Sequence, residues 1–440
     1  MKINKRFSLS VANPIFKMPA GAFLSFFIGF LAFYFLPIGG QLYISDLFCL
    51  FFAAICLLSG RVNRTFATLG MVGNVLVACA LAWLIQQCVT DLIRQTEFDN
   101  LIRGWSKIII FIACIISVAA ITKLKMERIV LCACGFAVAK ILETALFPND
   151  YTRDLPWKYG YSFPVAVLVI SYICFFHKKY RVILLPISLV FLGIANVVMN
   201  FRSMFLFCMI SAGVCFAVDM GRLFFGSRKL RASLYMPLVI AMMAITTFSA
   251  KEVYEYAANN GVLGAEAQQK YYAQSSGDLS ILQAGRNESL VSTVAIKNSP
   301  IIGYGSWAKN HDYAVMQIEL LRQKHIEAQY SGDGSAEFIP THSYILGAWV
   351  EAGIVGALFW AVAFTVVLGA AFLIVDAGGS FMCVGFFLFI NLLWNIPFSP
   401  FGADTRLSAA ITLCCALSVL KTTNVERIFR STSRNLLRRA

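Results

Sequence analysis

Charged side chains are scarce in this sequence. Only 14% of its 440 residues are charged, 59% are hydrophobic, and the mean hydropathy is +0.71. A water-soluble domain of this composition would leave apolar surface in contact with water. The composition therefore excludes a soluble globular protein and indicates an integral membrane protein.

The longest polar segment, residues 252–340, lacks cysteine, and all 13 cysteines lie in or beside hydrophobic stretches. This distribution excludes a disulfide framework or a thiolate metal site in the segment. The segment also has no Asp-x-Asp pair and no histidine cluster, so its sequence predicts no metal site. An internal repeat is absent too, which leaves the inverted-repeat architecture of many transporters without support.

Long hydrophobic stretches are abundant. A helix needs roughly 20 apolar residues to cross a bilayer core, and about 12 stretches approach that length. They cover residues 19–38, 41–59, 67–88, 104–122, 129–147, 159–177, 182–199, 203–218, 233–250, 353–375, 380–396 and 404–420. Their apolar runs are continuous, whereas the strands of a membrane barrel would alternate apolar and polar residues. We therefore expect an all-α polytopic membrane protein with about 12 transmembrane helices.

The positions of lysine and arginine predict the orientation, because basic residues stay on the cytoplasmic side of short loops. Basic clusters occupy alternate connections, at residues 2–17, 61–64, 123–128, 178–181, 222–231 and 421–439. We expect these segments and both termini to be cytoplasmic. Residues 89–103, 148–158, 200–202, 252–340 and 397–404 then lie outside. The net charge of +14 is spread over short loops, which argues against a nucleic-acid partner.

Residues 252–340 form an outer loop far longer than a connection requires, and such loops are usually functional or disordered. The loop has helix-like stretches, among them an amphipathic run to Lys297, and a Pro- and Gly-rich turn over 298–307. We divide the chain into N-terminal helices (1–184), a region around the loop (185–375), and C-terminal helices with a basic tail (376–440).

Five side chains in this region are candidates for chemistry. Arg286 lies in the acidic loop, and Arg202 lies at the outer membrane boundary, where a charge is costly without a partner. His342 is one of the few groups there that exchange a proton near neutral pH. Each has a simpler interpretation: Arg202 as a snorkelling anchor, His342 as a residue that begins a helix, and Trp307 and Tyr344 as interfacial aromatics.

Several short motifs in this region resemble one known family. They are Gly285-Arg286, Pro300-x-x-Gly303-x-Gly305, His342-Ser343-Tyr344-x-Leu346 and Glu351-x-Gly353-x-x-Gly356, with Asn200-Phe201-Arg202-Ser203 upstream. Their order around a long outer loop resembles the domain shared by bacterial O-antigen ligases and Wzy-type O-antigen or exopolysaccharide polymerases. In that family an Asn usually follows the His, and here Ser343 does. The resemblance covers roughly residues 185–375.

The resemblance implies a metal-independent glycosyltransferase of the bacterial inner membrane, with no cofactor. It would transfer a glycan from undecaprenyl diphosphate to an acceptor sugar hydroxyl at the outer face. Arg202 and Arg286 would bind the diphosphate, because arginine matches phosphate oxygens bidentately. His342 would be the catalytic base. Trp307 and Tyr344 would contact the glycan, and a chain-length regulator or a flippase is an expected partner.

Three classes of function fit the sequence. The first is the membrane enzyme, either a polymerase for O-antigen, capsule or exopolysaccharide or an O-antigen ligase acting on lipid A core or a protein. The second is a polysaccharide transporter, and the third is a sensor or scaffold of an envelope complex. A transporter would carry broken helices and charges near the membrane centre. Here the polar residues collect at one face, which favours the enzyme.

The orientation is testable with fusion reporters. Because basic residues are retained in the cytoplasm, a reporter fused after Lys309 should behave as periplasmic and one fused after Arg228 as cytoplasmic. Paired alkaline phosphatase and green fluorescent protein fusions measure both sides independently. The opposite pattern would invert every side assignment above.

Overall fold

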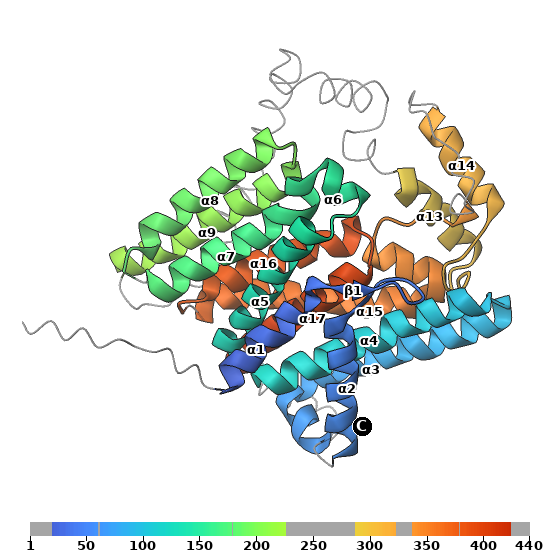
Figure 1. Ribbon diagram of the computed structural model, residues 1–440, viewed down its shortest axis with the longest axis horizontal. Helices are drawn as coiled ribbons and strands as arrows, with labels where there is room; N and C mark the ends of the chain where they lie inside the picture. Colours follow the sequence, from blue (N-terminus) through green and yellow to red (C-terminus); the bar gives the residue numbers. More distant parts are fainter. Residues whose placement is uncertain are drawn as a thin grey trace, which may run out of the picture.

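The structure is a computed structural model that describes residues 20–59, 62–177, 179–225, 287–322, 337–377 and 379–423. Nearly all of these residues are helical (Figure 1). The N-terminal elements are α1 (Ala20–Phe30), the 3-10 helix η1 (Leu31–Phe33), strands β1 (Phe35–Leu36) and β2 (Leu42–Tyr43), α2 (Ile44–Leu58), α3 (Val62–Arg94), α4 (Phe98–Thr122), α5 (Met126–Leu146) and α6 (Asp150–Asp154). After the π-helical turn η2 (Trp157–Tyr161) follow α7 (Ser162–Phe176), α8 (Arg181–Val198), α9 (Arg202–Phe225), α13 (Asn287–Asn298), α14 (His311–Arg322), α15 (Tyr344–Ala377), α16 (Met382–Phe398) and α17 (Ala403–Thr422). Strands β1 and β2 form the one sheet of the described residues, an antiparallel pair.

Eight helices of the described residues are long and apolar enough to cross a membrane: α3, α4, α5, η2 with α7, α8, α9, α15 and α17. Three shorter apolar helices, α1 with η1, α2 and α16, coincide with further predicted spans. These helices confirm the expected all-α multi-pass membrane protein. The predicted span at 233–250 lies outside the described residues, and the count of twelve stays a prediction.

Helices α4 and α17 form the centre of the bundle. In their most apolar windows 72% and 78% of the residues are buried, against 22% for α8, which lies at the periphery. Close helix packing depends on small residues, because a side chain at Gly29 or Gly135 would overlap the backbone of the facing helix in the α1–α5 pair. The cysteines described are free and mostly buried, consistent with a packing role.

Polar contacts join helix ends that are predicted, from the positions of the basic residues, to lie on the same side of the membrane. On the predicted outer side they are Tyr43–Glu143, Asp46–Arg406, Asp91–Ser306, Trp157–Asn196 and Ser343–Ile396. On the predicted inner side they are Arg181–Asp219, Arg181–Gly379, Lys421–Thr68 and Ser418–Leu124. The helices therefore run in the alternating directions that the basic clusters predict.

Helix α15 is interrupted at Ala352 and Gly353, where the predicted membrane span begins. Gly353 has a φ of 64°, and the short helix before it, from Tyr344, changes direction there. An interruption leaves carbonyl groups without helical partners. The turn at 300–305 supplies replacements, since the backbone N–H groups of Tyr304 and Gly305 donate to the carbonyls of Val350 and Glu351 at 2.8 and 3.0 Å.

The turn and the interruption fit together only with glycine at both contact points. A Cβ on Gly353 would lie 1.9 Å from the carbonyl oxygen of Ile301, and one on Gly303 would lie 2.6 Å from the nitrogen of Gly353. Both glycines also have positive φ. Two of the sequence motifs that carry the family resemblance are thus in direct backbone contact.

Gly353→Ala should destabilise the protein. The left-handed backbone alone costs about 1–2 kcal/mol for a residue with a Cβ, and the overlap with Ile301 adds to it. Thermal unfolding of the purified protein in detergent measures the loss as a lower melting temperature. Gly369→Ala in the same helix is the matched control, because nothing lies within 4 Å of its added Cβ. Equal melting temperatures for the two variants would contradict this account of the turn.

Candidate functional site

The described part of the long polar loop folds as a small unit with its own core. Helices α13 and α14 pack on the start of α15 through Val291, Ala295, Tyr313, Ile339 and Val350. Residues 308–310 pair with 337–339 as a short antiparallel ladder. Helix α13 covers the run to Lys297 that the sequence predicts and ends at Asn298. The unit lies at the end of the bundle where α3 and α4 meet (Figure 1).

The carboxylate of Asp91, at the end of α3, anchors the turn to the membrane helices. It accepts hydrogen bonds from the backbone N–H of Ser306 at 2.6 Å and from the Ser306 hydroxyl at 2.7 Å. Thr96 and the indole N–H of Trp105 donate to it at 2.9 and 2.8 Å. A buried carboxylate with four such donors is well compensated for its loss of water.

Arg94 binds the same turn from the other side. Its guanidinium donates to the carbonyl of Gly303 at 3.0 Å and to the hydroxyl of Ser299 at 2.9 Å, and it lies over the ring of Tyr304. Burial raises the pKa of Tyr304 to about 12, and the hydrogen bond with Tyr313 contributes. The Tyr304 hydroxyl is therefore protonated at neutral pH.

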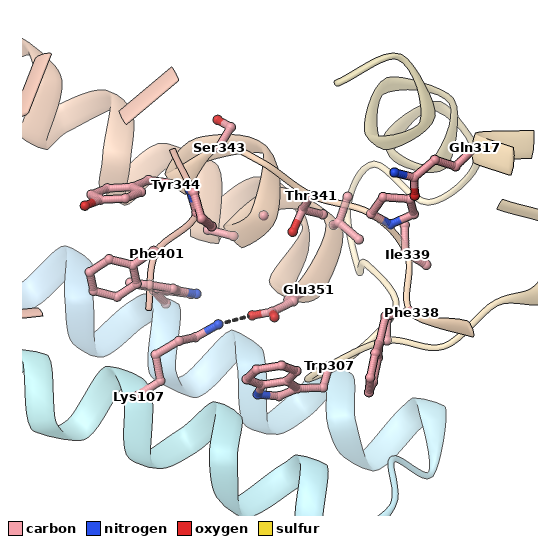
Figure 2. A pocket seen from close by; sticks show the side chains of 17 residues that line it. Lys107, Trp307, Gln317, Phe338, Ile339, Thr341, Ser343, Tyr344, Glu351 and Phe401 are labelled. Carbon is pink, nitrogen blue, oxygen red and sulfur yellow. Dashed lines mark hydrogen bonds and ion pairs between the residues drawn. The ribbon is translucent and has the colours of Figure 1, made fainter. Parts of the chain in front are cut away.

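A cavity of about 340 Å³ lies between this loop unit and the membrane helices. Its wall comes from α3, α4, the loop, the start of α15 and the connection between α16 and α17. The lining residues are Trp83, Lys107, Trp307, Ala308, Gln317, Phe338, Ile339, Pro340, Thr341, Ser343, Tyr344, Gly347, Ala348, Val350, Glu351, Pro400 and Phe401. Figure 2 shows Lys107 and Glu351 pointing toward each other across it, with Trp307 and Phe338 to one side.

Tyr344 and Trp307, both predicted as glycan contacts, line this cavity in different ways. Tyr344 is 1% exposed and packs in an aromatic cluster, with its ring centroid 4.8 Å from Trp360 and 5.0 Å from Phe401. Trp307 is 43% exposed and meets the ring of Phe338 edge to face. Trp307 thus has an accessible ring surface, whereas the ring of Tyr344 is almost fully buried.

The ion pair between Lys107 and Glu351 is the polar centre of the cavity. Their charged atoms lie 2.5 Å apart, and each side chain is 15% exposed. Lys107 lies within the predicted apolar span 104–122 and Glu351 belongs to one of the short motifs, but neither is among the predicted site residues. The useful signal is a lysine inside an apolar span, since such charges need a partner.

His342, the predicted catalytic base, lies immediately before α15 and is exposed. Its neighbours Thr341 and Ser343 both line the cavity. The Ser343 hydroxyl accepts from the backbone N–H of Leu346 at 3.2 Å, which caps the helix, and donates to the carbonyl of Ile396 at 2.9 Å. Serine at this motif position therefore holds the start of α15 against α16, a role that asparagine could also perform as a cap.

Of the two predicted phosphate ligands, Arg202 lies among the described residues. Arg202 is the first residue of α9 and is partly buried. Helix α9 packs on α16, where Phe207 contacts Trp394, so Arg202 lies at the same end of the bundle as Ser343. Arg286 lies outside the described residues.

Two further ion pairs near helix ends are closed by their own partners. Lys140 and Glu143 are 2.6 Å apart, and both bond to the Tyr43 hydroxyl. Asp46 pairs with Arg406 at 2.7 Å, with side chains 1% and 5% exposed. None of these four residues is among those that line the cavity, whereas Lys107 is.

Within the described ranges, no group of three or more His, Cys, Asp or Glu side chains is placed to hold a metal ion. No model of a known protein family, no curated protein and no solved structure matches this chain.

Proposed function

We propose that this protein is a membrane glycan polymerase of the bacterial inner membrane. It would transfer an undecaprenyl-diphosphate-linked oligosaccharide to an acceptor sugar hydroxyl at the outer face. One observation supports this most directly: Ser343 and Tyr344 of the His342 motif and Glu351 of the Gly353 motif line one cavity, and the turn at 300–305 is hydrogen-bonded to the backbone of Val350 and Glu351 beside it. A lipid-anchored donor and a water-borne acceptor meet at that depth.

In this proposal the acceptor hydroxyl gives its proton to His342 while its oxygen attacks the anomeric carbon of the donor glycan. The bond from that carbon to the diphosphate oxygen breaks, and undecaprenyl diphosphate leaves. His342 is exposed beside the cavity, which supports access to an acceptor from the aqueous side. Arg202, at the same end of the bundle, and Arg286 bind the diphosphate and stabilise the charge that develops on it.

The proposed topology has 12 spans, with both termini in the cytoplasm and the 252–340 loop in the periplasm. The grouping of helix ends into two sides supports the alternation, and the basic clusters support the choice of the cytoplasmic side. The loop unit and its cavity then face the periplasm, where a flippase delivers lipid-linked glycans and a chain-length regulator would act.

Arg202→Ala and Arg286→Ala should abolish polymer formation while the protein stays in the membrane, because each loses a diphosphate contact. Lysine should restore activity only partly, since a point charge replaces a bidentate fork. Polymer length on gels, normalised to protein in isolated membranes, is the measurement. Arg153→Ala is the control, because Arg153 is well exposed and on the same predicted side. Full polymer from either alanine variant would remove that arginine from the site.

His342→Ala should lower the transfer rate by about 10²- to 10⁴-fold, the usual contribution of general acid–base catalysis. The assay uses purified protein, undecaprenyl-diphosphate-linked repeat units and a chelator, with the products separated by length. His342→Gln keeps a hydrogen bond without the basicity and should be similarly slow. His311→Ala, at another exposed histidine of the loop unit, should retain the wild-type rate.

The same assay separates polymerase from ligase. Elongated lipid-linked repeats indicate a polymerase, whereas transfer only to added lipid A core indicates the O-antigen ligase reaction. Wild-type protein that forms neither product, or His342→Ala protein that is as fast as wild type, would refute the mechanism as drawn.

A further inference from the structure

The cavity is electrically neutral. Among the described residues that line it, Lys107 and Glu351 are the charged ones, and they neutralise each other at 2.5 Å. A diphosphate would gain little Coulomb energy in such a site, because attraction to the ammonium is offset by repulsion from the carboxylate. The cavity is thus poorly suited to the anionic part of a lipid-linked substrate and better suited to an uncharged one.

The chemistry of the wall matches a sugar. Trp307 offers a partly exposed ring, and Phe338 stands edge to face against it, so an apolar sugar face has a surface to stack on. Gln317 and Thr341 add an amide and a hydroxyl. At about 340 Å³ the cavity is at the lower end of small-molecule sites, which span about 300–1,000 Å³. It suits a short glycan segment better than a long chain.

A close ammonium–carboxylate pair is well matched to a hydroxyl group. A hydroxyl donates one hydrogen bond and accepts others, whereas an ammonium only donates and an ionised carboxylate only accepts. One sugar hydroxyl, or two adjacent ones, can therefore bridge Lys107 and Glu351 and replace part of their direct contact. Such charge-assisted bonds are stronger than bonds between neutral groups.

The position of Glu351 is held by the fold. Its backbone carbonyl accepts from Gly305, and the next turn of α15 begins at Gly353. Lys107 comes from the separate helix α4. By contrast, the Asp46–Arg406 pair is almost fully buried, and Lys140–Glu143 is closed by Tyr43. The Lys107–Glu351 pair differs from these because it faces a cavity.

We propose that this cavity is a subsite for one neutral sugar unit, with Lys107 and Glu351 as its specificity-determining pair and Trp307 as its stacking surface. That this sugar belongs to a glycan undergoing transfer rests on the proposed function. The binding of a neutral sugar in the cavity does not depend on that function. The diphosphate of the donor would lie outside this cavity.

Binding is tested with purified full-length protein in nanodiscs by saturation-transfer NMR. The probes are neutral hexoses, 6-deoxyhexoses, N-acetylhexosamines and their disaccharides, with sodium diphosphate as the anionic probe. At least one sugar should bind to wild type. Its Kd should rise about tenfold or more in Glu351→Gln, in Lys107→Met and in Trp307→Ala, because each removes one strong contact. Diphosphate binding should be unchanged in Lys107→Met.

Two further variants separate sugar binding from a purely structural ion pair. The double variant Lys107→Glu with Glu351→Lys keeps the pair but exchanges donor and acceptor positions. It should recover the melting temperature and not the sugar affinity. Lys140→Met breaks the closed pair and should leave sugar affinity unchanged.

Three outcomes overturn the subsite: no sugar of the panel binds to wild type, Glu351→Gln binds the same sugar equally well, or diphosphate competes with the sugar and is lost in Lys107→Met. The transferase proposal fails on a different result. His342→Ala should keep sugar binding. A wild-type protein that binds sugar through Glu351 but shows no transfer activity would therefore support the subsite and contradict the proposed enzyme.

Discussion

The docking of the 300–305 turn onto the interruption of α15 is the contact on which the rest of the site depends. A helix that breaks near the membrane boundary leaves carbonyl groups that must find new donors. The backbone of Tyr304 and Gly305 supplies them, and Gly303 and Gly353 make the approach sterically feasible. The interruption directly follows Glu351, which lines the cavity, and the short helix before it begins two residues after His342.

Polar anchoring of the turn explains how a loop can be rigid enough to form a cavity wall. Asp91 receives four close hydrogen bonds, two of them from Ser306, and Arg94 bonds to the backbone at Gly303. Trp307 directly follows this anchored serine. Its ring is consequently held at the cavity edge by the backbone before it and by Phe338 beside it.

The charges of the bundle divide into two kinds by environment. Asp46 with Arg406, and Lys140 with Glu143, are closed pairs whose loss of one partner would strand a buried charge. Lys107 and Glu351 also compensate each other, but their pair faces an open space lined by aromatic rings and hydroxyl groups. Compensation of opposite charges therefore forms structural ion pairs at Asp46–Arg406 and Lys140–Glu143. At Lys107–Glu351 it forms an ion pair that a ligand in the cavity can contact.

The sequence by itself determined that this is a helical multi-pass membrane protein, because long apolar runs can satisfy their backbone hydrogen bonds in a bilayer only as helices or closed barrels. It also predicted the alternation of the loops between two sides and a helix-like run up to Lys297, which α13 covers, since these depend on where basic residues collect and on local spacing. Only the tertiary structure decided that Gly303 meets Gly353, that Asp91 binds Ser306, that Tyr344 is buried, and that Lys107 faces Glu351. Those contacts join residues separated by dozens to hundreds of positions, and a single sequence contains no local pattern that specifies which distant partner a buried charge or a glycine will meet.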